Sequence, residues 1–372
     1  MEELQPGAPA APAGRVRKES VPFTGYQQFI ILILALLQFT IILDFMIISP
    51  LGDILLKTLG LSTSQFGSVV SAYAISAGIS GILAAGFADK FDRKKLLLFF
   101  YTGFIIGTAF CALAYNYHTL LLANMWGWHA TFIMVVILSI LIGVAVVTRL
   151  KPLTEHLKLQ SDKNALQHLW HTIQKRDYRI GFLATAMLSL GGFMLMPFTS
   201  AFLVNNVMIA QADLPVIFFF TGISSMIIMP LIGRLSDRVD KFKIFVFGSV
   251  VAAIMVVVYT NLGPVPIWMV IVINMILFMG IMSRMVPATA LNSAVPEMYD
   301  RGAFMSINSS LQQMAGGVAA MFAGLVVVQA AESSPLKHFD TLGYVMVVIM
   351  VICIFLVYRV SRVVKRKLPV SS

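Results

Sequence analysis

Long apolar segments follow one another along almost the whole chain, and they constrain its fold more than any other feature. The segments Phe29–Ile48 and Val345–Val357 are clear examples. A helix needs roughly 20 mostly apolar residues to cross the hydrocarbon core of a bilayer. Hydrophobic residues make up 58% of the 372 positions and charged residues only 12%, well below the charged share of an ordinary soluble domain. The sequence therefore predicts an all-α integral membrane protein.

Hydropathy predicts ten membrane-spanning helices. Their expected ranges are 29–50, 66–87, 96–115, 131–148, 181–204, 214–233, 244–262, 266–294, 304–329 and 341–358. An even number of spans puts both termini on the same side of the membrane. On that side fall 24 of the 27 lysines and arginines, whereas Lys57 and Lys337 fall on the other and Arg284 falls within a span. Because positively charged loops stay in the cytoplasm, we expect both termini there and the protein in the plasma (inner) membrane.

The same pattern divides the chain into five parts. They are a disordered tail 1–28, a four-span bundle 29–148, a linker 149–180, a six-span bundle 181–358 and a basic tail 359–372. In the linker, Leu166, Leu169, Trp170 and Ile173 recur at helical spacing among polar residues, which predicts an amphipathic helix on the cytoplasmic membrane face. The net charge of +10 is thus mainly a topology signal, and no nucleic-acid partner is expected.

A short charged loop occurs twice in the chain. Residues 89–95 read DKFDRKK and residues 237–243 read DRVDKFK, and each loop follows the second helix of its half. Positive-inside loops are basic in any case, but the matched aspartates favour a true repeat. Duplicated halves with the substrate site between them are typical of secondary transporters.

The first loop resembles the signature G-x-x-x-D-[RK]-x-G-[RK]-[RK] of the major facilitator superfamily. Four residues match the signature: Asp89, Lys90, Arg93 and Lys94. Asp92 stands where the family has a glycine, and the leading glycine, Gly86, is displaced by one position. The second loop, with Gly233, Asp237 and Arg238, fits the start of the signature better.

Three other stretches resemble the same family. Asp44-Phe45 followed by Pro50-Leu51 resembles helix 1 of its drug–proton antiporters. Trp126-Gly127-Trp128, followed by Phe132, resembles the entry to family helix 6. Pro296 to Arg301-Gly302 resembles the loop between family helices 10 and 11. The resemblance implies a helical transporter of two bundles around a central cavity.

One departure from the family is large. About 59 residues separate Asp89 from the end of the fourth span at Thr148, against about 121 between Asp237 and Tyr358. The first bundle is therefore short by about 60 residues, or two helices. The resemblance implies that family helices 4 and 5 are lacking, with the junction near Ala123–Asn124.

Only two ionisable residues lie well inside the predicted spans, Asp44 and Arg284. A charge at the bilayer centre costs roughly 2.5–3.5 kcal/mol on insertion scales. Each of these two residues is therefore a candidate functional residue. Asp44 is the candidate for proton coupling, and Arg284 is the candidate for modulating its charge or contacting substrate. By resemblance their helices line opposite walls of the cavity. The alternatives are a solvated Asp44 near a helix end and an Arg284 that snorkels to the interface.

Uncharged polar residues inside the spans are candidates for substrate contact, with hydrogen bonding between helices as the alternative. They are Gln38, Tyr73, Asn274, Asn308, Gln312 and Gln313. Candidate gating residues lie in the two repeated loops, where Asp89 and Asp237 would hold and release the halves. Their basic neighbours are Lys90, Arg93, Lys94 and Arg238. The alternative is a plain loop ion pair worth under about 1 kcal/mol.

No nucleotide-binding loop, zinc-protease motif or hydrolase elbow occurs, so no enzyme activity, cofactor or metal site is expected. Transport would then draw on an ion gradient. The leading hypothesis is proton-coupled efflux of small, drug-like organic molecules by alternating access, with protons and the lipid bilayer as partners. Two alternatives stay open: a transport-inactive product of an internal deletion, and a sugar or osmolyte uniporter or importer on the same fold.

Overall fold

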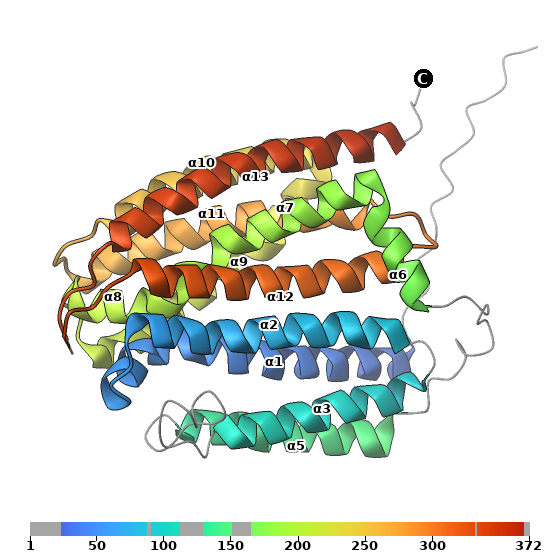
Figure 1. Ribbon diagram of the computed structural model, residues 1–372, viewed down its shortest axis with the longest axis horizontal. Helices are drawn as coiled ribbons and strands as arrows, with labels where there is room; N and C mark the ends of the chain where they lie inside the picture. The colour runs from blue at the N-terminus through green and yellow to red at the C-terminus, as the bar shows by residue number, and fades with distance from the viewer. Residues whose placement is uncertain (1–23, 88–90, 112–128, 151–164, 332, 368–372) are drawn as a thin grey trace, which may run out of the picture.

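The computed structural model describes residues 24–87, 91–111, 129–150, 165–331 and 333–367. The described residues form a set of long helices that lie side by side (Figure 1). The helices are α1 Gly25–Thr58, α2 Thr63–Phe87, α3 Arg93–Cys111, α5 His129–Arg149, α6 Ala165–Gln174, α7 Arg176–Phe193, α8 Thr199–Asn205, α9 Leu214–Arg238, α10 Lys241–Thr260, α11 Ile267–Ser293, α12 Arg301–Val326 and α13 Phe339–Lys367.

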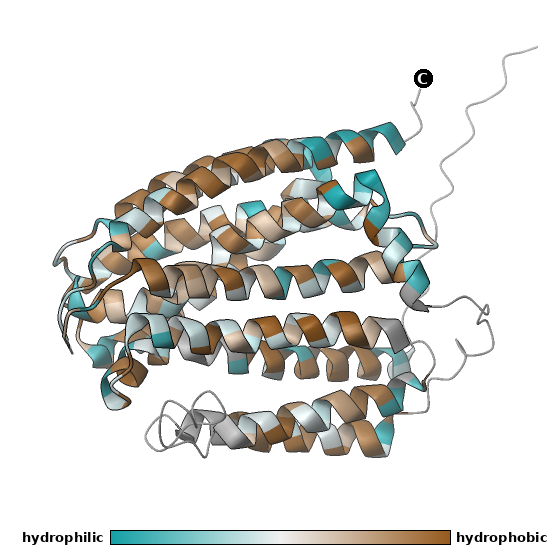
Figure 2. Cartoon of the chain, in the orientation of Figure 1, coloured by the Kyte–Doolittle hydropathy of each residue, from teal (hydrophilic) through white to brown (hydrophobic). Residues whose placement is uncertain are grey.

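The predicted fold class is confirmed, because the described helices fall at all ten predicted spans. Among the described residues, seven helical segments are long and apolar enough to cross a membrane, and α5 contributes a shorter apolar stretch, Val135–Arg149. Helix α12 is less apolar because Gln312, Gln313 and several serines lie along it. Apolar residues cover the middle of the long helices and polar residues gather at their ends (Figure 2). The protein is therefore a multi-pass membrane protein.

Two of the departures from the predicted ranges occur at prolines. Helix α1 runs through Pro50 and ends at Thr58, eight residues beyond the predicted end of the span. Prolines are tolerated inside membrane helices because neighbouring groups satisfy the freed backbone. The predicted span 181–204 is instead two helices, α7 and α8, separated by the 3-10 turn Met196–Phe198. Pro197 lies in this turn, where its missing N–H removes a helical hydrogen bond.

Helices α2 and α12 pack along one another and join the two bundles (Figure 1). The first bundle consists of α1, α2, α3 and α5, and the second of α7 to α13. Glycines make the seam between them close. A Cβ on Gly67 would lie 2.7 Å from the carbonyl oxygen of Ala320, and a Cβ on Gly81 would lie 2.5 Å from the Ser310 hydroxyl. Small residues at such a seam let two membrane helices approach closely.

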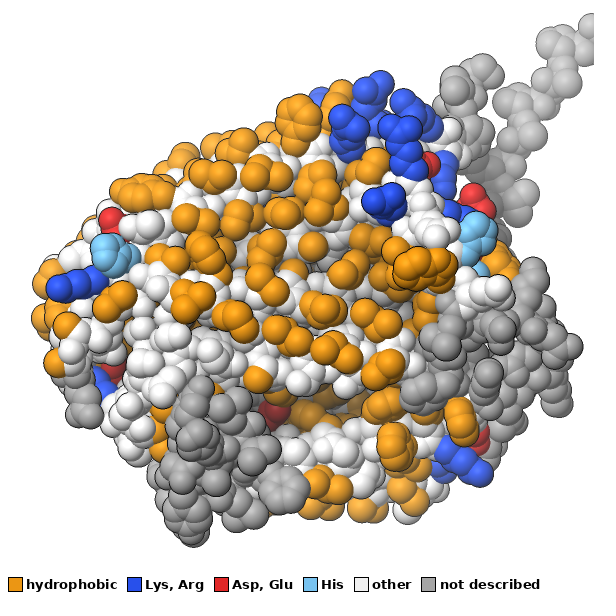
Figure 3. Space-filling model, viewed as in Figure 1, with side chains coloured by type: hydrophobic (Ala, Val, Ile, Leu, Met, Phe, Trp, Pro, Cys, Tyr) orange, Lys and Arg blue, Asp and Glu red, His pale blue; other side chains and the backbone are white. Residues whose placement is uncertain are grey.

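The molecule has two ends, which we name by their short helices. The α6 end contains α6, the start of α1 and the last turns of α13, and the α8 end contains α8 and the turn between α1 and α2 (Figure 1). Lysine and arginine side chains gather near the end of α13, whereas apolar side chains cover the middle of the visible face (Figure 3). The charge pattern predicted for a membrane protein is thus visible on the folded chain.

The buried apolar residues are arranged differently at the two ends. At the α8 end, one core contains residues of both bundles, such as Phe66 of α2 and Phe202 of α8. At the α6 end, the first bundle has its own core around Val146. The second bundle has another around Phe304. Among the described residues outside the α2–α12 seam, the bundles therefore share a core only at the α8 end.

Candidate functional site

Asp44 lies near the middle of α1, between the two ends of the bundle. Its side chain is buried, with 6% of the residue's surface exposed. The carboxylate oxygen Oδ1 has no hydrogen-bond partner among the described residues. The Thr108 hydroxyl of α3 lies beside the carboxylate without a hydrogen bond of normal geometry. A buried acid with an unfilled acceptor is unusual, because such groups are normally fully hydrogen-bonded.

A second polar contact joins α1 and α3 one turn away. The hydroxyl of Thr40 lies 3.1 Å from that of Tyr101, and it donates to the Leu37 carbonyl at 2.8 Å. We call Thr40, Asp44, Tyr101 and Thr108 the Asp44 cluster. Only Asp44 was singled out from the sequence. The spacing could have indicated the other three, because residues four apart on α1 and seven apart on α3 lie on one helix face.

Arg284 lies inside the second bundle and is not joined to Asp44. Its Nε donates a hydrogen bond to the Ser249 hydroxyl of α10 at 3.1 Å, and its guanidinium lies 5.7 Å from the centre of the Phe245 ring. The Cys353 thiol of α13 is a further neighbour. The Nη2 group has no hydrogen-bond partner, and no carboxylate of the described residues forms an ion pair with it. The residue is 3% exposed, so a cation is enclosed here with no counter-ion among the described residues.

Of the six uncharged polar candidates, Asn308 belongs to a cluster between α7, α11 and α12. Asn292 donates to the Asn308 side-chain oxygen at 2.8 Å and to the Thr185 hydroxyl at 2.6 Å, whereas its own Oδ1 has no partner within the described chain. Asn274 is buried in the second bundle. Among the others, Gln38 is exposed, and the half-buried ones are Tyr73, Gln312 and Gln313. Asn292 and Thr185 were missed because neither stands out in sequence from other buried polar residues.

The repeated loops have the same local structure where both are described. Asp92 accepts a hydrogen bond from the Lys94 backbone N–H at 2.9 Å, and Asp240 accepts one from that of Phe242 at 2.8 Å. Each second aspartate of the repeat therefore caps the N-terminus of the next helix, α3 or α10. Aspartate is a favoured N-cap because its oxygen satisfies an unpaired backbone donor. Asp92, which departs from the family signature, thus has a structural use.

Each loop also binds the last helix of its own bundle. The Lys94 ammonium donates to the Val147 carbonyl, at 2.9 Å, near the end of α5. Asp240 pairs with the Lys365 ammonium of α13, and this hydrogen bond lowers the pKa of the Asp240 carboxyl. Both contacts lie within one bundle rather than between the two.

Two of the remaining gating candidates make no side-chain contact among the described residues. Asp237 and Arg238 are exposed at the end of α9, and neither forms a hydrogen bond or ion pair with a described residue. Arg93 begins α3. Asp89 and Lys90 lie outside the described residues, as does the proposed junction at Ala123–Asn124.

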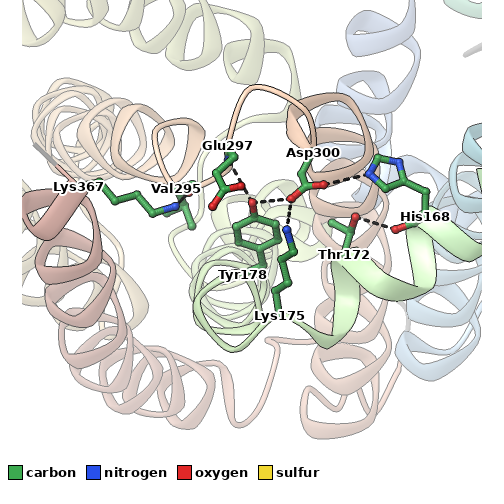
Figure 4. Close-up of polar contacts among 8 residues, drawn as sticks. All are labelled: His168, Thr172, Lys175, Tyr178, Val295, Glu297, Asp300 and Lys367. Atoms are coloured by element: carbon green, nitrogen blue, oxygen red, sulfur yellow. Dashed lines mark hydrogen bonds and ion pairs between the residues drawn. The ribbon is translucent and has the colours of Figure 1, made fainter. Parts of the chain in front are cut away.

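A fully bonded carboxylate at the α6 end was not predicted from the sequence. Asp300, just before α12, is 2% exposed. One oxygen lies 2.9 Å from His168 Nε2, and the other accepts bonds from the Tyr178 hydroxyl at 2.8 Å and from the Lys175 ammonium (Figure 4). Burial by itself raises the pKa of Asp300, but the hydrogen bonds with Lys175, His168 and Tyr178 lower it to about 2. Asp300 is therefore ionised at neutral pH.

These contacts attach α6 to the second bundle. Leu169 of α6 is buried in the same core as Phe304, whereas Trp170 and Ile173 are 64% and 38% exposed. Helix α6 packs against both α2 and α12. The sequence predicted this amphipathic helix, and the structure places its buried face on the ends of the two bundles. Its partner Asp300 was overlooked because a lone loop aspartate carries no sequence pattern.

Comparison with known proteins identifies the family. The profile of the Major Facilitator Superfamily matches residues 34–125, 118–320 and 181–372. A gallate transporter of Pseudomonas putida is 32% identical over 95 residues, which are 26% of this chain and 21% of that protein. The uncharacterized MFS-type transporter YceJ of Bacillus subtilis (strain 168) is 34% identical over 77 residues, which are 21% of this chain and 20% of that protein. The matches thus span about a fifth of the length of these curated relatives.

Two solved structures share the fold at low sequence identity. A bacterial homolog of the human lysosomal transporter Spinster, in an inward-facing and unoccupied conformation, has a TM-score of 0.69 at 14% identity. The match covers 94% of this chain and 100% of that one. The nucleoside transporter NupG has a TM-score of 0.63 at 14% identity, over 88% of this chain and 98% of that one.

Proposed function

The chain belongs to the major facilitator superfamily, and from this premise we propose that it moves small organic molecules across the membrane by proton-coupled alternating access. The observation that carries the proposal is the buried Asp44 carboxylate with its unfilled acceptor. Ionisable residues inside a membrane mark ion and proton pathways. A carboxylate that is enclosed in one state and hydrated in the other binds and releases a proton in each cycle.

The direction we propose is efflux, with drug-like molecules as the substrate class. The helix 1 pattern around Asp44 and Pro50 supports it by resemblance to drug–proton antiporters. The polar candidates Gln38, Tyr73, Asn274, Gln312 and Gln313, together with the Asn308 cluster, supply hydrogen-bonding groups along the helices. In this proposal they contact substrate in one or other state of the cycle, and the repeated loops at Asp89 and Asp237 act as gates at the α6 end.

We propose that the α6 end is cytoplasmic and that the protein lies in the inner membrane. The basic residues near this end, among them Lys175, Arg176 and Lys365, support this orientation. We also propose that family helices 4 and 5 are lacking. The described residues contain four long helices in the first bundle, whereas α7 and α8 together with α9 to α13 make six in the second.

A second candidate is the transport of an organic anion. The observation that favours it is Arg284, an enclosed cation with a free Nη2 group and no carboxylate partner among the described residues. Arginine binds carboxylates through paired hydrogen bonds. A gallate transporter is one of the relatives, and an aromatic carboxylate would supply the missing counter-ion once a conformational change exposes Arg284. In this candidate, gallate or benzoate uptake would depend on Arg284 and would fall at least about tenfold in Arg284→Gln.

The experiment that tests the main proposal is efflux from cells loaded with a panel of dyes and drugs, with and without a proton gradient. We expect gradient-dependent export by the native chain and its loss in Asp44→Asn, since the amide cannot carry the proton. Asp213→Asn is the matched control, because Asp213 is exposed at the start of α9. Export that persists in Asp44→Asn would contradict proton coupling at Asp44. Silence of the native chain across both the panel and the anions, with protein present in the membrane, would contradict transport itself.

A further inference from the structure

A second buried acid, Asp53, lies at the α8 end and has no part in the proposed coupling. It is in the last turns of α1 and is completely buried. The hydrogen bonds of its carboxylate come from two sides. The Lys57 ammonium of the same helix lies 2.8 Å from Oδ2, and Asn205 of α8 donates to Oδ1 at 2.7 Å. Asp53 is therefore bonded to both bundles at once.

The backbone around Asp53 meets α8 just as closely. The Asp53 N–H donates to the Ser200 hydroxyl at 3.2 Å. A Cβ on the preceding residue, Gly52, would lie 2.6 Å from the Pro197 carbonyl oxygen, so a side chain there would force the helices apart. Asn205 is itself held in place, since its amide also donates to the Ala201 carbonyl at 2.9 Å. The Asp53 acceptor and the Asn205 donor are thus each held in position by further contacts.

Other contacts close the same end between the bundles. The Thr63 hydroxyl at the start of α2 donates to the Val327 carbonyl at the end of α12 at 2.6 Å. The shared apolar core lies directly beside these bonds, with Leu55 and Leu56 of α1 and Phe198 beside α8. At the α6 end, by contrast, the Asp300 bonds join α6 and α7 to α12 and none of their partners is in the first bundle.

A buried ion pair is an expensive way to join two helices unless its partners fit well. Removing one partner leaves a buried charge uncompensated, which is strongly destabilising. A well-packed apolar pair would stabilise the fold as much as the ion pair does. A charged hydrogen-bonding group between two bundles is specific in geometry and is solvated by water when it separates. It therefore suits a contact that must form and break, and Lys57, which is 30% exposed, can follow the carboxylate into water.

We propose that Asp53 is the positioning residue that locks the α8 end, and that its bond to Asn205 breaks each time this end opens. The inference rests on the proposed alternating-access function. In the structure this lock is closed, so the α8 end is shut. Loss of the lock shifts the population toward the state open at the α8 end by about tenfold or more, the usual weight of a hydrogen bond to a charged group.

The test is the reactivity of a cysteine placed inside the lock. Ser200→Cys is nearly isosteric and lies at the completely buried contact with Gly52. With Cys111 replaced by serine, the native Cys353 is the internal control, since it is fully buried in the second bundle. The protein is purified in lipid nanodiscs and treated with a polar maleimide, so that both ends are accessible and neither orientation nor transport affects the readout.

We expect slow labelling at position 200 with native Asp53, and labelling at least about tenfold faster in Asp53→Ala while Cys353 stays protected. The exchanged pair Asp53→Asn with Asn205→Asp restores the hydrogen bond across the bundles, but not the bond to the Ala201 carbonyl, and labelling should be slower than in Asp53→Ala. Asp213→Asn, an exposed acid at the same end, should change nothing.

Equal labelling of position 200 in native and Asp53→Ala proteins would overturn the lock. Faster labelling of both cysteines would overturn it as well, because Asp53 would then support the whole fold. These results do not depend on substrate. A chain that transports nothing but opens at position 200 in Asp53→Ala would contradict the proposed function alone, whereas a transporting chain without this response would contradict the lock alone.

Discussion

The two ends of the molecule are closed by different means. At the α8 end the bundles touch directly, through one apolar core and through the bond between Asp53 and Asn205. At the α6 end each bundle has its own core, and the short helix α6 lies across the ends of α2 and α12, fastened by Asp300. Opening the α8 end requires the bundles themselves to part. Opening the α6 end parts the bundles along the α2–α12 seam but leaves most of each core intact.

The comparison also separates the buried acids by their hydrogen bonding. At the two ends, Asp53 and Asp300 have both carboxylate oxygens bonded, as expected of groups that hold parts together. Asp44, between the ends, has no hydrogen bond to Oδ1 from the described residues. The difference supports a role in holding helices together for Asp53 and Asp300, and an exchangeable proton on Asp44.

The largest effect should come from widening the seam at the α8 end. A valine side chain at Gly67 would collide with the backbone of α12, because even its Cβ would lie 2.9 Å from Gly324 Cα. Overpacking of this kind costs about 3 kcal/mol or more when backbone cannot move aside. We expect Gly67→Val to lower the thermal midpoint strongly in detergent. Gly103→Val is the control, since nothing lies within 4 Å of its Cβ. Equal midpoints for the two variants would contradict direct contact between the bundles here.

A smaller effect, with a defined pH dependence, should follow from Asp300→Asn at the α6 end. The folded pKa of about 2 is below the ordinary value of 3.8, so ionised Asp300 stabilises the fold above about pH 4 and this contribution is lost as the pH falls through 2. The shift corresponds to about 2 kcal/mol. Native protein should therefore be more stable than Asp300→Asn at pH 7, and the difference should vanish near pH 2.

Unfolding in detergent, followed from pH 7 to pH 2 for both proteins, measures that difference. Asp177→Asn is a matched control, because Asp177 is exposed at the start of α7 near the same cluster. A gap between native and Asp300→Asn that stays constant down to pH 2 would mean that the Asp300 charge does not hold α6.

The smallest effect should come from Lys365→Ala. Its ammonium pairs with Asp240, but the two side chains are 61% and 29% exposed. Ion pairs in water usually contribute under about 1 kcal/mol because the charges are well solvated. The thermal midpoint should hardly move, and it should move less than in Asp300→Asn. A larger loss than in Asp300→Asn would reverse the ranking of buried and surface contacts.

Most of the helices could be predicted from the sequence because lipid demands long apolar segments. The continuation of α1 to Thr58 could not, since Pro50 normally ends a helix in soluble proteins. The break before α8 was also missed, although Pro197 was visible. The helix continues through Pro50 but is interrupted at Pro197. Only the surrounding packing decides between these two outcomes.

The site was predictable only where a charge stood alone in an apolar span. Asp44 met that condition, and its burial agrees with the expectation. Thr108 beside Asp44, and Tyr101 beside Thr40, are ordinary polar residues that gain meaning only because α3 brings them next to α1. The partners of Arg284 were likewise hidden, because a span position does not say which neighbouring helix a side chain faces.

The measurement that tests the central claim most directly is proton movement in liposomes that contain the purified protein and a pH-sensitive dye. Addition of a transported substrate should drive protons in the native protein and in Asp213→Asn. In Asp44→Asn we expect no substrate-driven proton movement, while exchange of labelled for unlabelled substrate continues. Substrate-driven proton movement of native size in Asp44→Asn would contradict the account, because the proton would then be carried elsewhere.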